Sequence, residues 1–205
     1  MNDSDKTGEV DAKVERGALR RARIKLLTII GMVFIPLALA TVMYLYFPEL
    51  APETTTNQGT FLVPIVHLES LAIEEVVAEK WTLIMIGDGH CDPDCRQRMY
   101  LARQVHMALG KDVNRVHRLY LYTETELMPE FAAYIAETHP GLEAKQGNSE
   151  HLQAALGAAV QGADLNEIVL LMDPLGNLVL YYLPEQVGKP LQKDLKHLLK
   201  LSQIG

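Results

Sequence analysis

Residues 81–95 read WTLIMIGDGHCDPDC, and this stretch decides how the rest of the chain is interpreted. Its first half is an apolar run that predicts a buried strand, and a helical pattern follows Cys95. Cys91 and Cys95, the only two cysteines, therefore lie at a strand-to-helix junction, where a helix N-terminus favours thiolates. Two thiols this close predict either a soft-metal site or a disulfide that opens and closes.

The charges around the pair act in both directions. Asp92 and Asp94 oppose ionisation of the cysteines, whereas Arg96, Arg98 and the helix N-terminus promote it. Two sulfurs alone do not complete a structural zinc site, which needs four ligands. The alternative is a disulfide that only pins the loop, but closing so short a loop stabilises a fold weakly.

A long uncharged segment precedes this region. Residues 26–47 carry no charge, and five basic residues lie shortly before them: Arg16, Arg20, Arg21, Arg23 and Lys25. About 22 residues at roughly 1.5 Å per residue are enough to cross a hydrocarbon core of roughly 30 Å. The basic flank predicts a cytoplasmic segment 1–25, a single anchor at 26–47 and an exterior remainder. A signal peptide cleaved near residues 38–40 is the alternative.

The part beyond the anchor reads as a linker and one domain. Residues 48–60 are rich in Pro, Thr, Asn and Gln and predict a tether, and residues 61–205 have the length of a single domain. Residues 26–205 contain 21 Asp and Glu against 12 Lys and Arg. An acidic exterior of this kind argues against a nucleic-acid partner.

Periodicity and turn residues predict an alternating order of strands and helices. Strands are expected at 61–68, 82–86, 116–122, 168–172 and 178–182, and helices at 70–79, 94–109, 129–137, 149–160 and 190–201. Pro64 makes the first strand an edge or irregular strand. The helix between the second and third strands predicts a parallel pair, and residues 173–177 predict a hairpin turn. This order predicts a thioredoxin-like α/β sandwich.

The stretch at 80–95 also resembles the Sco (synthesis of cytochrome c oxidase), or SenC-like, family. The resemblance rests on the CxxxC pair after a strand and a glycine-bearing turn, on His90 before Cys91, and on residues 109–122 and 171–176. It implies a membrane-anchored thioredoxin-like protein that acts in maturation of the copper site of cytochrome c oxidase. In such proteins the cysteine pair either binds copper or reduces the oxidase's copper-binding cysteines.

The resemblance has one departure. The family's copper-binding histidine follows an aspartate, and in the matching stretch Asp164 is followed by Leu165, which cannot bind a metal. His90 is the nearest substitute by sequence, so the expected metal ligands are Cys91, Cys95 and His90, for Cu(I).

Two functions of different class follow from the resemblance. One is the enzyme activity of a thiol–disulfide oxidoreductase, with Cys91 as nucleophile and Cys95 as resolving thiol. The other is a non-enzymatic role, as a copper chaperone or a degenerate docking factor for oxidase assembly. A peroxidase on the same fold is a weaker third interpretation. The expected partners are an oxidase subunit or other assembly factors, and the expected location is a bacterial inner membrane with a periplasmic domain.

Overall fold

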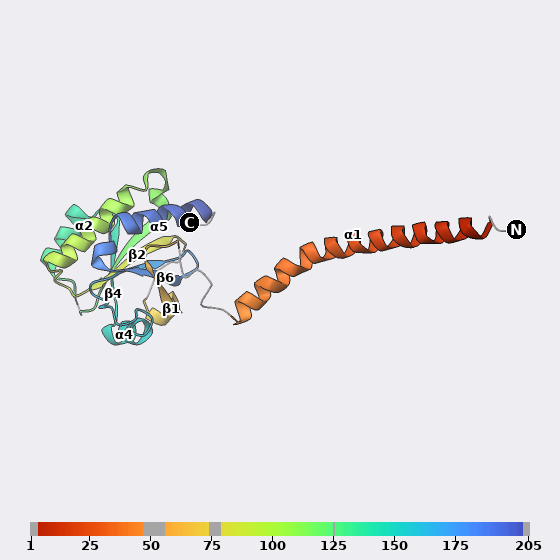
Figure 1. The fold of residues 1–205 in the computed structure, drawn as a ribbon. Coiled ribbons are helices and arrows are strands. Elements are labelled where there is room, and N and C mark those ends of the chain that lie inside the picture. Colours follow the sequence, from red (N-terminus) through yellow and green to blue (C-terminus); the bar gives the residue numbers. More distant parts are fainter. Residues whose placement is uncertain (1–3, 47–55, 74–78, 125, 203–205) are drawn as a thin grey trace. The chain divides into compact units, whose positions relative to one another are not determined.

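The computed structural model describes residues 4–46, 56–73, 79–124 and 126–202, with side chains from residue 23 onward except that of residue 44. It divides into two compact units, Met1–Thr55 and Thr56–Gly205. In the first unit, α1 (Ser4–Tyr46) is one long helix with Pro36 inside it. Within α1, Arg23–Met43 is long and apolar enough to cross a membrane, with mean hydropathy 2.4. The first unit therefore supplies one candidate transmembrane helix (Figure 1).

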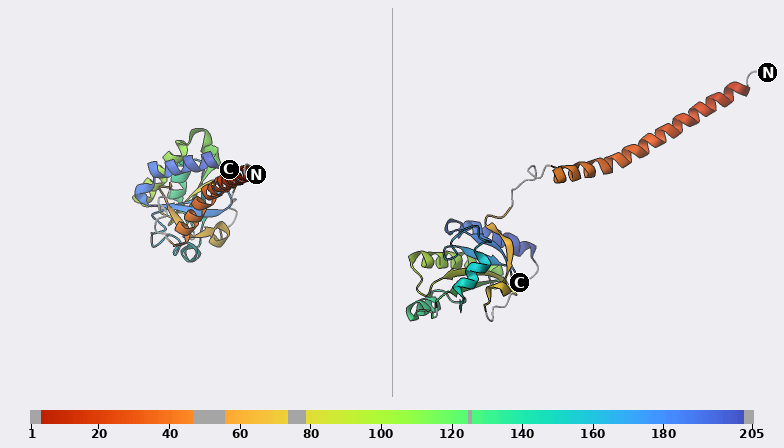
Figure 2. Two further views of the ribbon diagram at one scale, coloured as in Figure 1. Left: turned by 45° about the vertical axis from the view of Figure 1, so that its right-hand side comes forward. Right: turned by 90° about the horizontal axis from the view of Figure 1, so that it is seen from below.

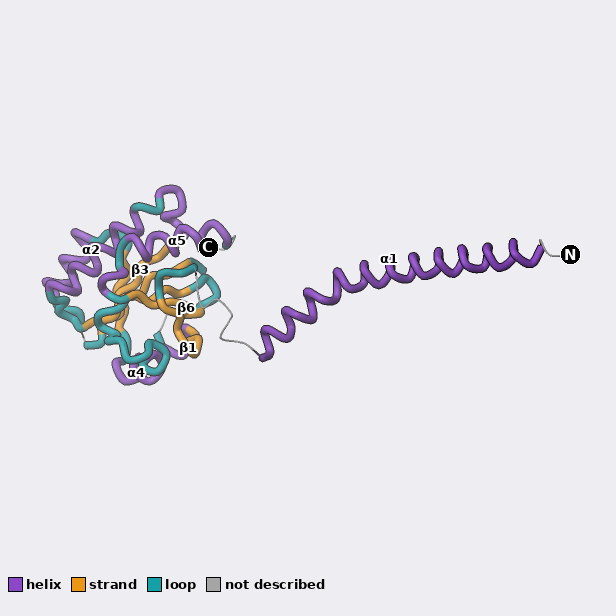
Figure 3. Tube along the Cα trace, viewed as in Figure 1, coloured by secondary structure: helices purple, strands orange, loops and turns teal. Residues whose placement is uncertain are grey.

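The second unit is built on a six-stranded mixed sheet in the order β1-β6-β5-β2-β3-β4. The strands are β1 (Thr60–His67), β2 (Trp81–Gly87), β3 (Val116–Tyr122), β4 (Leu142–Gln146), β5 (Val169–Met172) and β6 (Asn177–Tyr182). β2, β3 and β4 run parallel to their neighbours in that group, whereas β5, β6 and β1 add antiparallel pairs. Figure 3 shows the strands gathered between the helices.

Helices cover both faces of the sheet. The α-helices are α2 (Pro93–Met107), α3 (Pro129–Thr138), α4 (Ser149–Leu156) and α5 (Lys189–Leu201), and the 3₁₀ turns are η2 (Leu68–Leu71), η3 (Gly110–Arg115) and η4 (Pro184–Gln186). One core joins the sheet to α2, α3 and α5, and a second core joins it to α4 and η2. In Figures 1 and 2, α2 and α5 lie across the sheet from α4. The predicted thioredoxin-like sandwich is confirmed.

The central strand β2 contributes to both cores because its side chains alternate between the faces. Leu83 and Met85 lie in the first core, and Ile84 and Ile86 lie in the second. Every residue of β2 is buried, which explains why its sequence is apolar apart from Thr82. The strand is thus fixed on both sides up to Gly87, where the cysteine-bearing loop begins.

Several predicted elements differ from the structure. β4 was not predicted, because LEAKQ lacks β-branched and aromatic residues; its pairing with β3 makes it a strand at the edge of the sheet. The helix expected at 149–160 ends at Leu156, and the one expected at 94–109 ends at Met107. Residues 74–78 of the helix expected at 70–79 lie outside the described residues, and its first two residues belong to the 3₁₀ turn η2, which ends at Leu71. The prediction for Pro64 is confirmed, since β1 is an edge strand whose register shifts between Phe61 and Val66.

A buried carboxylate holds the start of the second unit in place. Asp194 of α5 is only 4% exposed, and its Oδ2 accepts hydrogen bonds from the backbone N–H of Gln58 (2.7 Å) and Gly59 (2.9 Å). The hydroxyl of Tyr182 donates a third bond to the same oxygen, at 3.0 Å. α5 is therefore tied both to β6 and to the segment that leads into β1.

Candidate functional site

The loop between β2 and α2 is organised by two aspartates. The Oδ1 atom of Asp88 accepts the backbone N–H of His90 and of Cys91, each at 3.0 Å. Burial opposes ionisation of Asp88, but these two hydrogen bonds and the charge of His90 prevail, so the pKa of Asp88 is lowered. Asp92 is the N-cap of α2 and accepts the N–H of Cys95 at 2.8 Å, with Pro93 in the first helical turn. Cys91 thus precedes the helix, and Cys95 lies in its first turn.

Cys91 and Cys95 form a disulfide with a Cα–Cα distance of 5.2 Å. Both residues are buried, 3% and 6% exposed, yet their sulfurs have different surroundings. The Sγ of Cys91 lies 3.4 Å from the Sδ of Met99, a core residue of α2 that is 1% exposed. The Sγ of Cys95 lies 3.6 Å from the hydroxyl of Tyr120 on β3. One sulfur therefore faces the core and the other faces a polar group.

Tyr120 links the loop, the sheet and the disulfide. Its hydroxyl donates to the backbone oxygen of Asp88 at 2.9 Å, and burial raises its pKa, so it remains protonated. The hydroxyl passes directly over Gly87, where a Cβ would collide with it. Glycine at the end of β2 is therefore required for the tyrosine to reach both Asp88 and Cys95. Periodicity placed Tyr120 in a strand but gave no sign of this contact.

A pocket of about 330 Å³ opens beside Cys95. Its lining brings together the end of β2, the start of α2 and the loop before β5: Gly87, Asp88, Asp92, Asp94, Cys95, Arg98, Tyr120, Thr123, Asp164, Asn166 and Glu167. Five of these residues are acidic. Of the two cysteines, Cys95 is the one that lines this pocket.

Arg98 is the cationic group of this pocket. It is 7% exposed and lies three residues after Cys95 on α2, a spacing that places both on one face of the helix. Its Nε has no hydrogen-bond partner among the described residues. Burial lowers the pKa of Arg98, while the charges of Asp92, Asp164 and Glu167 act in the opposite direction. Since an arginine stays protonated in proteins, a buried positive charge lies beside the disulfide.

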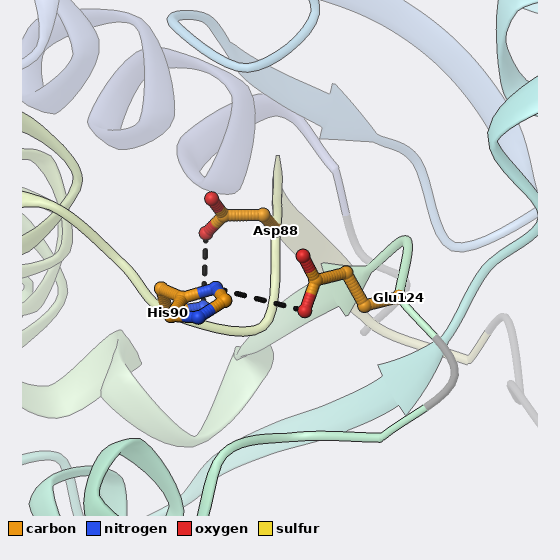
Figure 4. A group of neighbouring side chains, drawn as sticks. All are labelled: Asp88, His90 and Glu124. Carbon is orange, nitrogen blue, oxygen red and sulfur yellow. Dashed lines mark hydrogen bonds and ion pairs between the residues drawn. The ribbon is translucent and has the colours of Figure 1, made fainter.

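His90 makes its contacts away from the core. Its side chain is 59% exposed, and its Nδ1 lies 3.6 Å from Oε2 of Glu124. Asp88, His90 and Glu124 each offer a ligand atom, all within 4.8 Å of one another (Figure 4). All three residues are exposed, and Asp88 is already engaged by the backbone of the loop. The role of His90 as a ligand alongside the sulfurs stays a prediction.

Leu165 lies in a different core from the cysteines. It is 7% exposed and packs in the second core with α4, whereas Cys91 and Cys95 belong to the first. Its neighbours Asp164, Asn166 and Glu167 line the pocket beside Cys95. The loop thus contributes residues with side-chain oxygen atoms to the pocket lining, whereas Leu165 packs in the second core. The correspondence of Leu165 to the Sco histidine stays a prediction.

A family model described as "Transmembrane-like, thioredoxin-like, C-terminal domain" matches residues 81–202. Among solved structures, the chain is similar to yeast Sco1 with copper bound (17% identity, 60% of this chain and 80% of that chain, TM-score 0.49). Bradyrhizobium japonicum ScoI with copper bound gives 20% identity, 68% and 98% coverage, and a TM-score of 0.43. A Bacteroides thiol:disulfide interchange protein gives 15% identity, 71% and 91% coverage, and a TM-score of 0.46. No curated protein matches the chain.

Proposed function

The chain belongs to the family of transmembrane-like, thioredoxin-like C-terminal domains, and we propose that it is a membrane-anchored, Sco-like thiol–disulfide exchange protein. The single observation that carries this proposal is the Cys91–Cys95 disulfide at the strand-to-helix junction, with one sulfur facing a polar pocket. A disulfide that only stabilised the loop has no need of such a pocket. The buried Arg98 and the Tyr120 hydroxyl suit a sulfur that gains negative charge on reduction.

The surroundings of the two sulfurs favour Cys95 as the attacking thiolate. In the reduced protein, the Cys95 thiolate attacks one sulfur of a substrate disulfide, which breaks that bond and releases one substrate thiolate. Cys91 then loses its proton and attacks the Cys95 sulfur, which forms the Cys91–Cys95 disulfide and releases the second substrate thiolate. Two electrons pass to the substrate. This order reverses the one expected from sequence, because Cys91 packs against Met99 and Cys95 lines the pocket.

Trapping of a mixed disulfide tests both the exchange and its order. A Cys91→Ser variant keeps the attacking sulfur and removes the resolving one, so it accumulates a stable mixed disulfide with a disulfide-bonded CxxxC peptide. The matched Cys95→Ser variant forms little. The opposite pattern restores Cys91 as the attacking cysteine. A reduction potential far below about −300 mV, the range of inert structural disulfides, contradicts the exchange function altogether.

The substrate, the partners and the cellular location that we propose rest on the sequence resemblance. The substrate is a cytochrome c oxidase subunit whose copper-binding cysteines must be reduced, and other assembly factors are further partners. The basic residues that precede the apolar part of α1 support a cytoplasmic N-terminus and a periplasmic domain on a bacterial inner membrane. In this proposal residues 1–25, 26–47, 48–60 and 61–205 act as cytoplasmic segment, anchor, tether and working domain.

A second function, delivery of Cu(I), is favoured by the donor set. Thiolates and thioethers are ligands that Cu(I) prefers, and Cys91, Cys95 and Met99 place three sulfur atoms together. As a copper chaperone the protein carries the metal as cargo and uses the same cysteines. A degenerate docking factor is the remaining alternative; it predicts full oxidase assembly by a Cys91→Ser/Cys95→Ser variant.

A further inference from the structure

We propose that Met99 is the third ligand of a three-sulfur Cu(I) site formed with Cys91 and Cys95. The inference rests on the copper-carrying form of the proposed function and names the ligand that replaces the missing histidine. Its main observation is the 3.4 Å separation between the Sδ of Met99 and the Sγ of Cys91. Met99 also lies four residues after Cys95 on α2, so these two side chains share a face of the helix.

The site selects a soft ion because of what surrounds the sulfurs. All three residues are at least nine-tenths buried, in the core between α2 and the sheet. A thioether binds Cu(I) well but is a poor ligand for the hard cations that prefer oxygen. The oxygen groups of the loop before β5 lie in the pocket beside Cys95, and Leu165 packs in the other core. Met99 is therefore the neighbour whose chemistry suits Cu(I).

Copper loading of this site balances in protons and electrons. Reduction of the disulfide by an external dithiol gives two thiols, and binding of one Cu(I) releases two protons and forms two thiolate–copper bonds. Met99 adds a neutral lone pair, so the three ligands and the ion carry a net charge of −1. The Arg98 guanidinium, on the same face of α2 as Cys95, offsets part of the negative charge of the copper-loaded site and of the five acidic residues that line the pocket. Arg98 is buried, and its Nε has no hydrogen-bond partner in the described part of the chain. A negatively charged copper site beside it gives a reason for this buried cation.

X-ray absorption at the selenium edge tests the contact directly. The full-length protein, labelled with selenomethionine, purified in detergent and reduced, is loaded with Cu(I) under anaerobic conditions. A copper neighbour in the selenium spectrum is expected, and it should disappear in Met99→Leu. The matched control, Met172→Leu, changes a buried methionine of the second core and keeps the signal. Where Met99→Leu fails to fold, a spectrum of the unmutated protein without a copper neighbour still overturns the proposal.

Competition with a chromogenic Cu(I) chelator gives a second measurement. Met99→Leu should weaken Cu(I) binding roughly ten- to hundredfold, a range that even outer-shell changes reach in metal sites. Cu(I) binding with no copper–selenium contact, and with equal affinity in Met99→Leu, overturns the role of Met99 and leaves the cysteine pair as carrier. No Cu(I) binding by the unmutated protein overturns the site as well. Trapping of a mixed disulfide on Cys95 in that case shows that the exchange function survives.

Discussion

Replacement of Asp194 should loosen the attachment of the N-terminal edge of the domain. The carboxylate is buried, and one of its oxygens accepts three hydrogen bonds, from Gln58, Gly59 and Tyr182. Asp194→Asn keeps one acceptor oxygen, removes the charge and puts an NH₂ donor in place of the other oxygen. Asp194→Ala removes the acceptor altogether and leaves three donors without a partner.

The two variants should differ in magnitude. Hydrogen bonds to a charged group contribute about 1.5–3 kcal/mol and neutral ones about 0.5–1.5 kcal/mol, so loss of the charge costs about 1 kcal/mol for each bond. Asp194→Asn should therefore lower the free energy of unfolding by about 3 kcal/mol. In Asp194→Ala each of the three unsatisfied donors costs about 1–3 kcal/mol, so the loss should be about 3–9 kcal/mol with a midpoint of about 6 kcal/mol, a large part of the stability of a domain this size.

Guanidinium denaturation followed by tryptophan fluorescence measures this loss. Trp81 is the only tryptophan and is buried in β2, so its emission reports on the second unit. Glu137→Gln, an exposed substitution on α3, is the matched control and should change stability by less than about 0.5 kcal/mol. An Asp194→Asn variant as stable as the control refutes the part assigned to the charge, and equal losses in Asp194→Asn and Asp194→Ala refute the part assigned to the remaining acceptor oxygen. Two variants as stable as the control refute the attachment itself.

Three further predictions concern pH, capping and orientation. Burial, assisted by Arg118 and Arg103, lowers the pKa of His139 from 6.5 to about 4, so the unfolded chain binds a proton that the folded domain does not. The free energy of unfolding should thus fall by up to about 3 kcal/mol as pH drops from about 6.5 to about 4. Urea titrations across this range measure the effect. If a His139→Asn variant shows the same pH dependence, His139 is not its source. Asp92→Ala removes the N-cap bond to Cys95 and should cost about 1 kcal/mol of thermal stability; an unchanged melting temperature counts against the cap. Protease added outside bacterial spheroplasts should degrade residues 56–205, and protection of this segment excludes the proposed orientation.

Much of the fold could be predicted because its central strands β2 and β5 are buried on both faces. The apolar run of β2 and the alternation in β3 left little ambiguity, and the turn at 173–177 identified the hairpin of β5 and β6. β4 was missed because its identity as a strand comes from pairing with β3 and not from its own residues. The 3₁₀ turn η3 was missed for a similar reason, since Gly110 marks the end of a helix equally well.

Only those features of the candidate site that depend on residues close together in the sequence could be predicted. The spacing of Cys91 and Cys95 predicted a pair close enough to form a disulfide, and their predicted position at the start of a helix was correct. The surroundings of each sulfur depend on contacts across the fold, such as that of Tyr120 from the neighbouring strand, which no local pattern encodes. Met99 had a usable signal, because it lies one helical turn after Cys95, but a methionine at that spacing is far more often a core residue.

The close approach of Tyr120 to Gly87 also sets a rule for natural variation in this family. A side chain at position 87 and a tyrosine hydroxyl at position 120 cannot occupy the same space. Relatives that keep the tyrosine should keep the glycine, and relatives with alanine or serine at position 87 should have a shorter residue at position 120. The two positions should therefore change together across homologous sequences, although they lie 33 residues apart in the chain.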